Sequence, residues 1–73
     1  MKSFSVILKK IRKENNLTQK QLAELTGLSE RGIQNYELGT RNPNYDVLLK
    51  LGDYFNVSVD YLMGRTDNPN INK

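Results

Sequence analysis

With 73 residues, the chain is long enough for one domain but leaves little room for a deep active-site cleft, since a domain this small buries only about 60% of its unfolded surface. It contains no Cys and no His, which excludes disulfides, the common zinc sites, and catalysis by a Cys nucleophile or a His base. The net charge is +3, but residues 1–41 carry eight Lys and Arg against four Asp and Glu, while the remainder has a balance of −1. This asymmetry indicates a polyanionic partner for the N-terminal half.

The apolar spacing is helical throughout and predicts an all-α fold, a compact bundle of five short helices. A first helix is expected from about residue 3 to 15, with an apolar stripe at Phe4, Leu8 and Ile11. Thr18 begins a second helix, because Thr18 and Gln21 have the spacing of a capping box. Its inward residues are expected to be Leu22 and Leu25, and Gly27 ends it in the left-handed conformation.

Three further helices follow, each with a capping residue at its start. Ser29 caps a third helix that runs to about Leu38, and Asn44 caps a fourth with an inner stripe at Val47, Leu48, Leu51 and Phe55. Gly52 permits close packing there. Ser58 caps a short fifth helix that ends at Gly64. Residues 1–64 are therefore expected to form the domain, and residues 65–73 a flexible polar tail.

The turn around Gly27 joins the second and third helices in very few residues. So short a connection sets two helices at a steep angle, which is the helix-turn-helix geometry. Small Ala23 lies four residues before Gly27, where a larger side chain would separate the helices. The crossing requires burial of Leu22, Leu28, Ile33 and Tyr36. An ordinary helical hairpin with a glycine turn is the alternative.

Several short motifs occur together between Leu8 and Gly64: TQ-x-x-LA, the glycine turn, I-x-x-YE-x-G, the N-P before the fourth helix, and V-S-x-D-YL-x-G. In this combination the chain resembles the Cro/CI-type helix-turn-helix family of phage and bacterial repressors, the XRE family. The resemblance implies a lambda-repressor-like DNA-binding domain whose third helix enters the major groove of double-stranded DNA. It also implies a bacterial or phage-encoded protein of the cytoplasm, associated with the nucleoid.

The outward side of the third helix carries side chains suited to reading base edges. Arg forks to guanine, and Asn or Gln pairs with adenine, which fits Arg31, Gln34 and Asn35. By position in the family motif, Glu30, Arg31 and Asn35 match the main base-reading sites. The Glu30 carboxylate repels phosphate and, among the bases, can accept a hydrogen bond only from cytosine. It is equally expected to serve only as a negative charge at the N-terminal tip of the helix. Solvated polar residues are the plain alternative for the whole face.

Other polar residues are candidates for the phosphate backbone. Gln19 begins the second helix, where its amide and the free N–H groups of the helix terminus can hold a phosphate, as the matching Gln of the family does. Thr18 is primarily a cap. Further candidates for phosphate contacts are Asn16 before this helix and Arg41 and Asn42 after the third. In contrast, we expect a solvated face with long-range attraction for Lys9, Lys10 and Lys13.

Two charged residues are expected to face inward. Arg12 lies four residues after Leu8, at the edge of the apolar stripe, and Glu37 lies on the inner side of the third helix. An unpaired buried charge is costly, so the sequence predicts a structural Arg12–Glu37 salt bridge, which the resemblance also implies.

Two positions depart from the family pattern. Gly32 replaces the commoner Ser or Thr and either permits close approach to DNA or has no role, and Leu38 replaces a basic or polar residue.

We therefore expect a sequence-specific transcriptional regulator, a repressor in the simplest case, that binds a palindromic operator as a homodimer. The candidate dimer surface is helix five, whose apolar residues are Val57, Val59, Tyr61, Leu62 and Met63. Most of them can equally pack into the domain's own core. A protein-binding module, such as an antitoxin or adaptor, is the alternative. The sequence contains no paired carboxylates, phosphate loop or metal cluster, so nothing in it indicates an enzyme, a bound metal or a cofactor. No apolar run is long enough to span a membrane or resembles a signal peptide.

Overall fold

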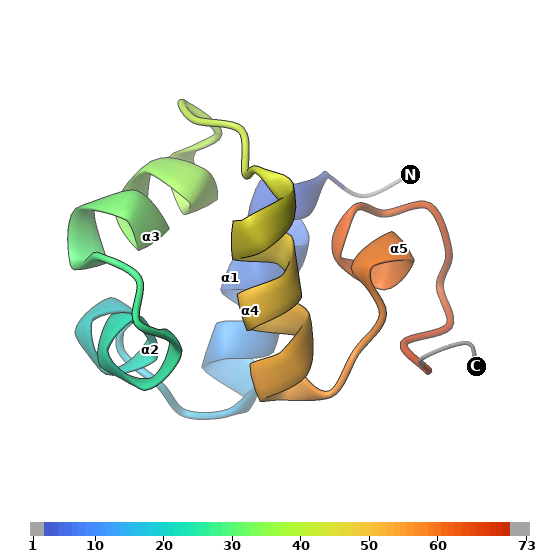
Figure 1. Ribbon diagram of the computed structural model, residues 1–73, viewed down its shortest axis with the longest axis horizontal. Coiled ribbons are helices and arrows are strands. Elements are labelled where there is room, and N and C mark those ends of the chain that lie inside the picture. The colour runs from blue at the N-terminus through green and yellow to red at the C-terminus, as the bar shows by residue number, and fades with distance from the viewer. Residues whose placement is uncertain (1–2, 71–73) are drawn as a thin grey trace.

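The computed structural model describes residues 3–70, and every regular element in that part of the chain is helical (Figure 1). In chain order these elements are α1 (Phe4–Glu14), α2 (Gln19–Thr26), α3 (Glu30–Leu38), α4 (Tyr45–Phe55) and α5 (Val59–Leu62). In Figure 1, α1 and α4 occupy the centre, with α2 and α3 on one side and α5 on the other. The predicted all-α fold of five short helices is confirmed.

Each helix begins where a polar side chain satisfies a backbone N–H of the first turn. The capping side chains are those of Ser3, Thr18, Ser29, Asn44 and Ser58. Thr18 and Gln21 form the predicted capping box, in which each side chain accepts a hydrogen bond from the backbone of the other. Gly27 and Gly39 end α2 and α3 with φ of 75° and 78°, a left-handed conformation that residues with a Cβ rarely adopt. The helix boundaries are thus set by local chemistry.

The core fills the space between the helices. Its fully buried large side chains are Leu8, Leu22, Ile33, Leu51 and Leu62. Tyr36 is buried as predicted, whereas Leu28 and Phe55 pack against the core from half-buried positions. Ile7, which the predicted stripe omitted, is only 4% exposed and belongs to the core.

The prediction that Leu25 faces inward is wrong, because this side chain is 54% exposed. The buried side of α2 consists of Leu22 and Ala23, and Leu25 lies about 110° around the helix axis from the midpoint between them. α2 packs against α3 and α4, and neither of these helices covers that position, so Leu25 is left to solvent. Apolar spacing alone identified two candidate inner residues, and the packing partners selected one.

The polar tail passes close to α5 as far as it is described. The Ser58 N–H donates to the Pro69 carbonyl (2.9 Å), and the Arg65 N–H donates to the Asp60 carbonyl (2.9 Å). Residues 71–73 of the predicted tail lie outside the described residues. Flexibility of the whole tail stays a prediction.

Gly52 is buried where α4 meets the start of α5, and a Cβ at this position would lie 2.9 Å from the backbone carbonyl oxygen of Val57. We expect Gly52→Ala to lower the free energy of unfolding by about 1 kcal/mol, since overpacking costs ~1–3 kcal/mol and the better helix propensity returns ~1. Urea denaturation measures the change. The neighbouring exposed position supplies the control, Asp53→Ala, which meets no such obstacle. A Gly52→Ala variant at least as stable as the parent would refute close packing here.

Candidate nucleic-acid interface

The α2–α3 pair has the steep crossing expected of a helix-turn-helix, as Figure 1 shows. In the turn, the Leu28 N–H donates to the Ala23 carbonyl (3.0 Å), which closes the end of α2 before Ser29 caps α3. The inner side of α3 packs against both α1 and α2 through Ile33 and Tyr36. The opposite side of α3 is consequently left to solvent.

This outer side of α3 carries the four residues predicted to read bases. Glu30, Arg31 and Gln34 are exposed, and Asn35 is half-buried. The Thr40 hydroxyl lies 3.4 Å from the Asn35 side-chain oxygen, so the Asn35 amide nitrogen remains available as a donor. The structure thus places these residues on one surface, as a binding face requires.

Gly32 lies on the buried side of α3 rather than on this surface. Its N–H donates to the Ser29 hydroxyl (3.0 Å), and a Cβ at Gly32 would lie 2.9 Å from that same oxygen. The missing side chain therefore makes room for the helix cap. Gly32 is therefore not part of the exposed surface that carries Arg31 and Gln34, and a close approach of DNA at this position stays a prediction.

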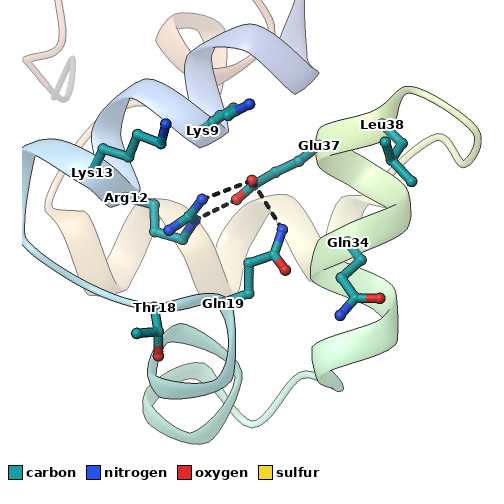
Figure 2. A pocket seen from close by; sticks show the side chains of 8 residues that line it. All are labelled: Lys9, Arg12, Lys13, Thr18, Gln19, Gln34, Glu37 and Leu38. Carbon is teal, nitrogen blue, oxygen red and sulfur yellow. Dashed lines mark hydrogen bonds and ion pairs between the residues drawn. The ribbon is translucent and has the colours of Figure 1, made fainter.

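A cleft of about 590 Å³ lies between α1, the start of α2, and α3 (Figure 2). All but one of its lining residues are polar or charged, and they are Lys9, Arg12, Lys13, Thr18, Gln19, Gln34, Glu37 and Leu38. Lys9 and Lys13 are exposed, as a solvated face requires, but they also form the α1 side of this cleft. The sequence did not indicate this role, because it arises only when α1 and α3 are packed together.

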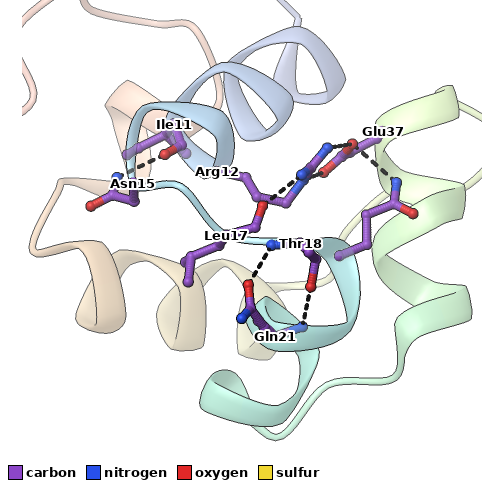
Figure 3. A network of polar contacts seen from close by, with 8 residues as sticks. Ile11, Arg12, Asn15, Leu17, Thr18, Gln21 and Glu37 are labelled. Carbon is purple, nitrogen blue, oxygen red and sulfur yellow. Dashed lines mark hydrogen bonds and ion pairs between the residues drawn. The ribbon is translucent and has the colours of Figure 1, made fainter.

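The floor of the cleft contains the predicted ion pair between Arg12 and Glu37 (Figure 3), which is confirmed. The Arg12 Nε and Nη2 atoms donate to the two carboxylate oxygens of Glu37 at 2.6 and 3.0 Å, a bidentate arrangement. Nη1 donates to the Leu17 carbonyl at 2.7 Å. The two side chains are only 11% and 5% exposed. The hydrogen bond to Glu37 raises the pKa of Arg12 against the opposing effect of burial, so the guanidinium stays charged.

Gln19 joins this network, which sequence reasoning did not predict. Its amide nitrogen donates to Glu37 Oε1 at 3.2 Å, so Glu37 fixes the orientation of the side chain and leaves the second amide N–H free to donate. At the same helix terminus, Thr18 satisfies the N–H groups of Gln21 and Leu22. The N–H groups of Gln19 and Lys20 belong to the first turn, where no intrahelical acceptor exists. Donors thus converge at the start of α2, as phosphate binding requires.

The remaining phosphate candidates fall into two groups. Asn16 is exposed in the α1–α2 turn, with a left-handed φ of 57°, and belongs with Thr18 and Gln19. Arg41 and Asn42 are exposed in the loop between α3 and α4, at the other end of the molecule in Figure 1. The Arg41 guanidinium lies 5.9 Å from the centre of the Tyr36 ring. The structure therefore places candidate phosphate contacts on both sides of the α3 surface.

None of the described helices is long and apolar enough to cross a membrane. Within residues 3–70, no three carboxylate side chains converge as a metal site would require.

Comparison with known proteins agrees with this geometry. A family model described as helix-turn-helix matches residues 8–62. The HTH-type transcriptional regulator ImmR of Bacillus subtilis is 42% identical over 60 residues, which are 82% of this chain and 47% of that protein. The uncharacterized HTH-type transcriptional regulator YqaE of the same bacterium is 38% identical over 68 residues, 93% of this chain and 59% of that protein. The chain thus spans about half the length of these relatives.

Among solved structures, the P22 c2 repressor protein in complex with a synthetic operator has a TM-score of 0.80 and 27% identity, over 86% of this chain and 96% of that one. The matched residues include α2, the turn and α3, which are the elements that form the exposed surface described above. The chain therefore belongs to the helix-turn-helix family of the Cro/CI (XRE) type.

Proposed function

We propose that the domain binds double-stranded DNA sequence-specifically, with α3 in the major groove, and that it regulates transcription by occupying an operator. The observation that carries this proposal is the outer side of α3, where Glu30, Arg31, Gln34 and Asn35 face away from the core. Arg, Gln and Asn have the hydrogen-bonding geometry that distinguishes base pairs in the major groove. Repression follows in the simplest case, because an occupied operator blocks polymerase.

Contacts to the phosphate backbone would fix this helix in register. In the proposed complex, Gln19, which Glu37 orients, and the free N–H groups of α2 would contact one strand. Arg41 and Asn42, which are exposed, would contact the backbone on the other side of α3. Such contacts position a protein on DNA without reading its sequence. Neither role needs a metal, a cofactor or a catalytic group, so we propose a binding protein and not an enzyme, acting in the cytoplasm of a bacterial cell.

A homodimer on a palindromic operator is part of the proposal, since one copy of so small a surface contacts few bases. Fewer residues are exposed at the proposed dimer surface around α5 than the sequence indicated. Val57 and Leu62 are buried in the domain's own core, Val59 and Tyr61 pack against it, and Met63 is 46% exposed. Within that set, Met63 offers the most apolar surface to a second copy.

Selection of bound sequences from random duplex DNA tests the proposal. We expect enrichment of two inverted half-sites, and an affinity for the selected duplex whose logarithm falls linearly with the logarithm of salt concentration, by about 0.9 per neutralised phosphate. A scrambled duplex of equal length serves as the control. Absence of any enriched sequence, combined with a salt-insensitive complex with another protein, would favour the antitoxin or adaptor alternative.

A further inference from the structure

The cleft between α1 and α3 has two walls of different chemistry, as Figure 2 shows. On the α1 side stand Lys9 and Lys13, one helical turn apart. On the α3 side stand Gln34 and Leu38, also one turn apart. One wall is therefore cationic and the other is neutral, with an apolar end.

The cationic wall holds charge that the rest of the molecule does not neutralise. Arg12 is also in the cleft, but both carboxylate oxygens of Glu37 accept its hydrogen bonds, so the pair is close to neutral. Among the described residues, neither Lys9 nor Lys13 forms an ion pair. These two lysines therefore give the cleft its positive charge, and the first turn of α2 adds the positive end of a helix dipole.

Leu38 is 74% exposed, more than any other large apolar side chain in the part of the chain that is described. A single exposed leucine is ordinary in itself. Its position is informative, because it follows Arg31 and Gln34 at intervals of seven and four residues and so continues their outward side toward the end of α3. The first residues of a recognition helix reach the bases, which leaves its last turn beside the sugar-phosphate backbone.

From this arrangement we infer that the cleft holds one backbone unit of DNA in a single orientation, with the phosphate toward Lys9 and Lys13 and the deoxyribose against Leu38. The inference rests on the proposed function and adds three residues to the proposed interface. The opposite orientation would place an anion against a leucine and an apolar sugar face against two ammonium groups. Gln19 and the N–H groups of α2 supply hydrogen-bond donors at the floor of the cleft, where the phosphate oxygens would lie.

To test the inference, fluorescence anisotropy measures the affinity of each variant, at several salt concentrations, for a duplex that the parent selected. Lys9→Gln and Lys13→Gln should each weaken binding to the selected and scrambled duplexes by the same factor, and each should reduce the salt slope by about 0.9. Lys50→Gln is the control, since Lys50 carries the same charge but pairs with Asp46 on α4 at 3.2 Å. It should leave the slope nearly unchanged.

The proposed contact between Leu38 and the deoxyribose is tested separately in the same assay. Leu38→Ala should weaken binding about fivefold with no change in salt slope, because it removes an apolar contact and no charge. Leu49→Ala, at an exposed leucine on α4, is the control and should bind as the parent does. Circular dichroism checks that every variant is folded.

Each result distinguishes this inference from the proposed function. If the parent binds a selected duplex but the affinity and slope are unchanged in Lys9→Gln and Lys13→Gln, the orientation is wrong and the proposed function stands. If Leu38→Ala binds with unchanged affinity, the proposed contact between Leu38 and the deoxyribose is likewise wrong. A parent that binds no duplex DNA overturns the proposed function and this inference together.

Discussion

Arg12→Ala should lower the free energy of unfolding by about 3 kcal/mol, because it leaves the Glu37 carboxylate buried without its cation. The Leu17 carbonyl loses its hydrogen-bond donor in the same variant. A domain of this size shifts its Tm by roughly 4–8 °C per kcal/mol, so a thermal melt should show a fall of about 12–24 °C. That change is a large share of the total stability of a small domain.

The neighbouring Lys13 supplies a matched control for this experiment, since it is a basic residue on the same helix but exposed. Lys13→Ala should change the free energy of unfolding by less than about 0.5 kcal/mol. Replacing both partners with apolar residues of similar volume, as in Arg12→Met with Glu37→Leu, should cost much less than Arg12→Ala alone. An Arg12→Ala melt that coincides with the parent would show that the ion pair has no structural role.

The direction of the Arg12 pKa shift determines how this stabilisation depends on pH. The folded-state pKa is raised, chiefly by the hydrogen bond with Glu37. The contribution that comes from charging Arg12 is therefore fully present below the ordinary pKa of arginine, and it is lost only when the pH rises through the raised value. Titration of Arg12 should thus have no effect on stability near neutral pH.

Arg31→Ala should weaken binding to the selected duplex by about 1–3 kcal/mol, the discrimination that a good bidentate contact to guanine provides. The loss should be specific to duplexes that carry the guanine, because a duplex with another base at that position already lacks the contact. Anisotropy titrations of parent and variant against both duplexes measure the difference. Lys50→Ala removes an equal charge from α4, away from this surface, and should weaken both duplexes slightly and equally. Equal losses on both duplexes for Arg31→Ala would assign Arg31 to a phosphate instead.

The sequence predicted the helix boundaries well because they depend on neighbours in the chain. The hydroxyl or amide of Thr18, Ser29 or Asn44 needs only a backbone N–H three residues later. The left-handed Gly27 and Gly39 likewise respond to local conformation. The error at Leu25 has the opposite origin, since its exposure depends on which helices pack against α2.

The same distinction applies to the candidate site. The Arg12–Glu37 pair could be predicted, because two inward charges of opposite sign each need a partner in so small a core. The Gln19–Glu37 hydrogen bond could not be predicted, because it joins residues 18 positions apart that meet only at the α2–α3 crossing. The cleft that joins Lys9 and Lys13 to Leu38 depends on the packing of α1 and α3 and left no signal in the spacing.

The outer side of α3 is proposed to select the base sequence. The most direct measurement is selection from one random duplex library by the parent, Arg31→Ala and Asn35→Ala in parallel, after circular dichroism has shown that all three are folded. We predict that each variant loses or changes its preference at a small number of positions, repeated symmetrically in both half-sites, and keeps the others. If both variants bind DNA and select the same sequence as the parent, the claim is contradicted.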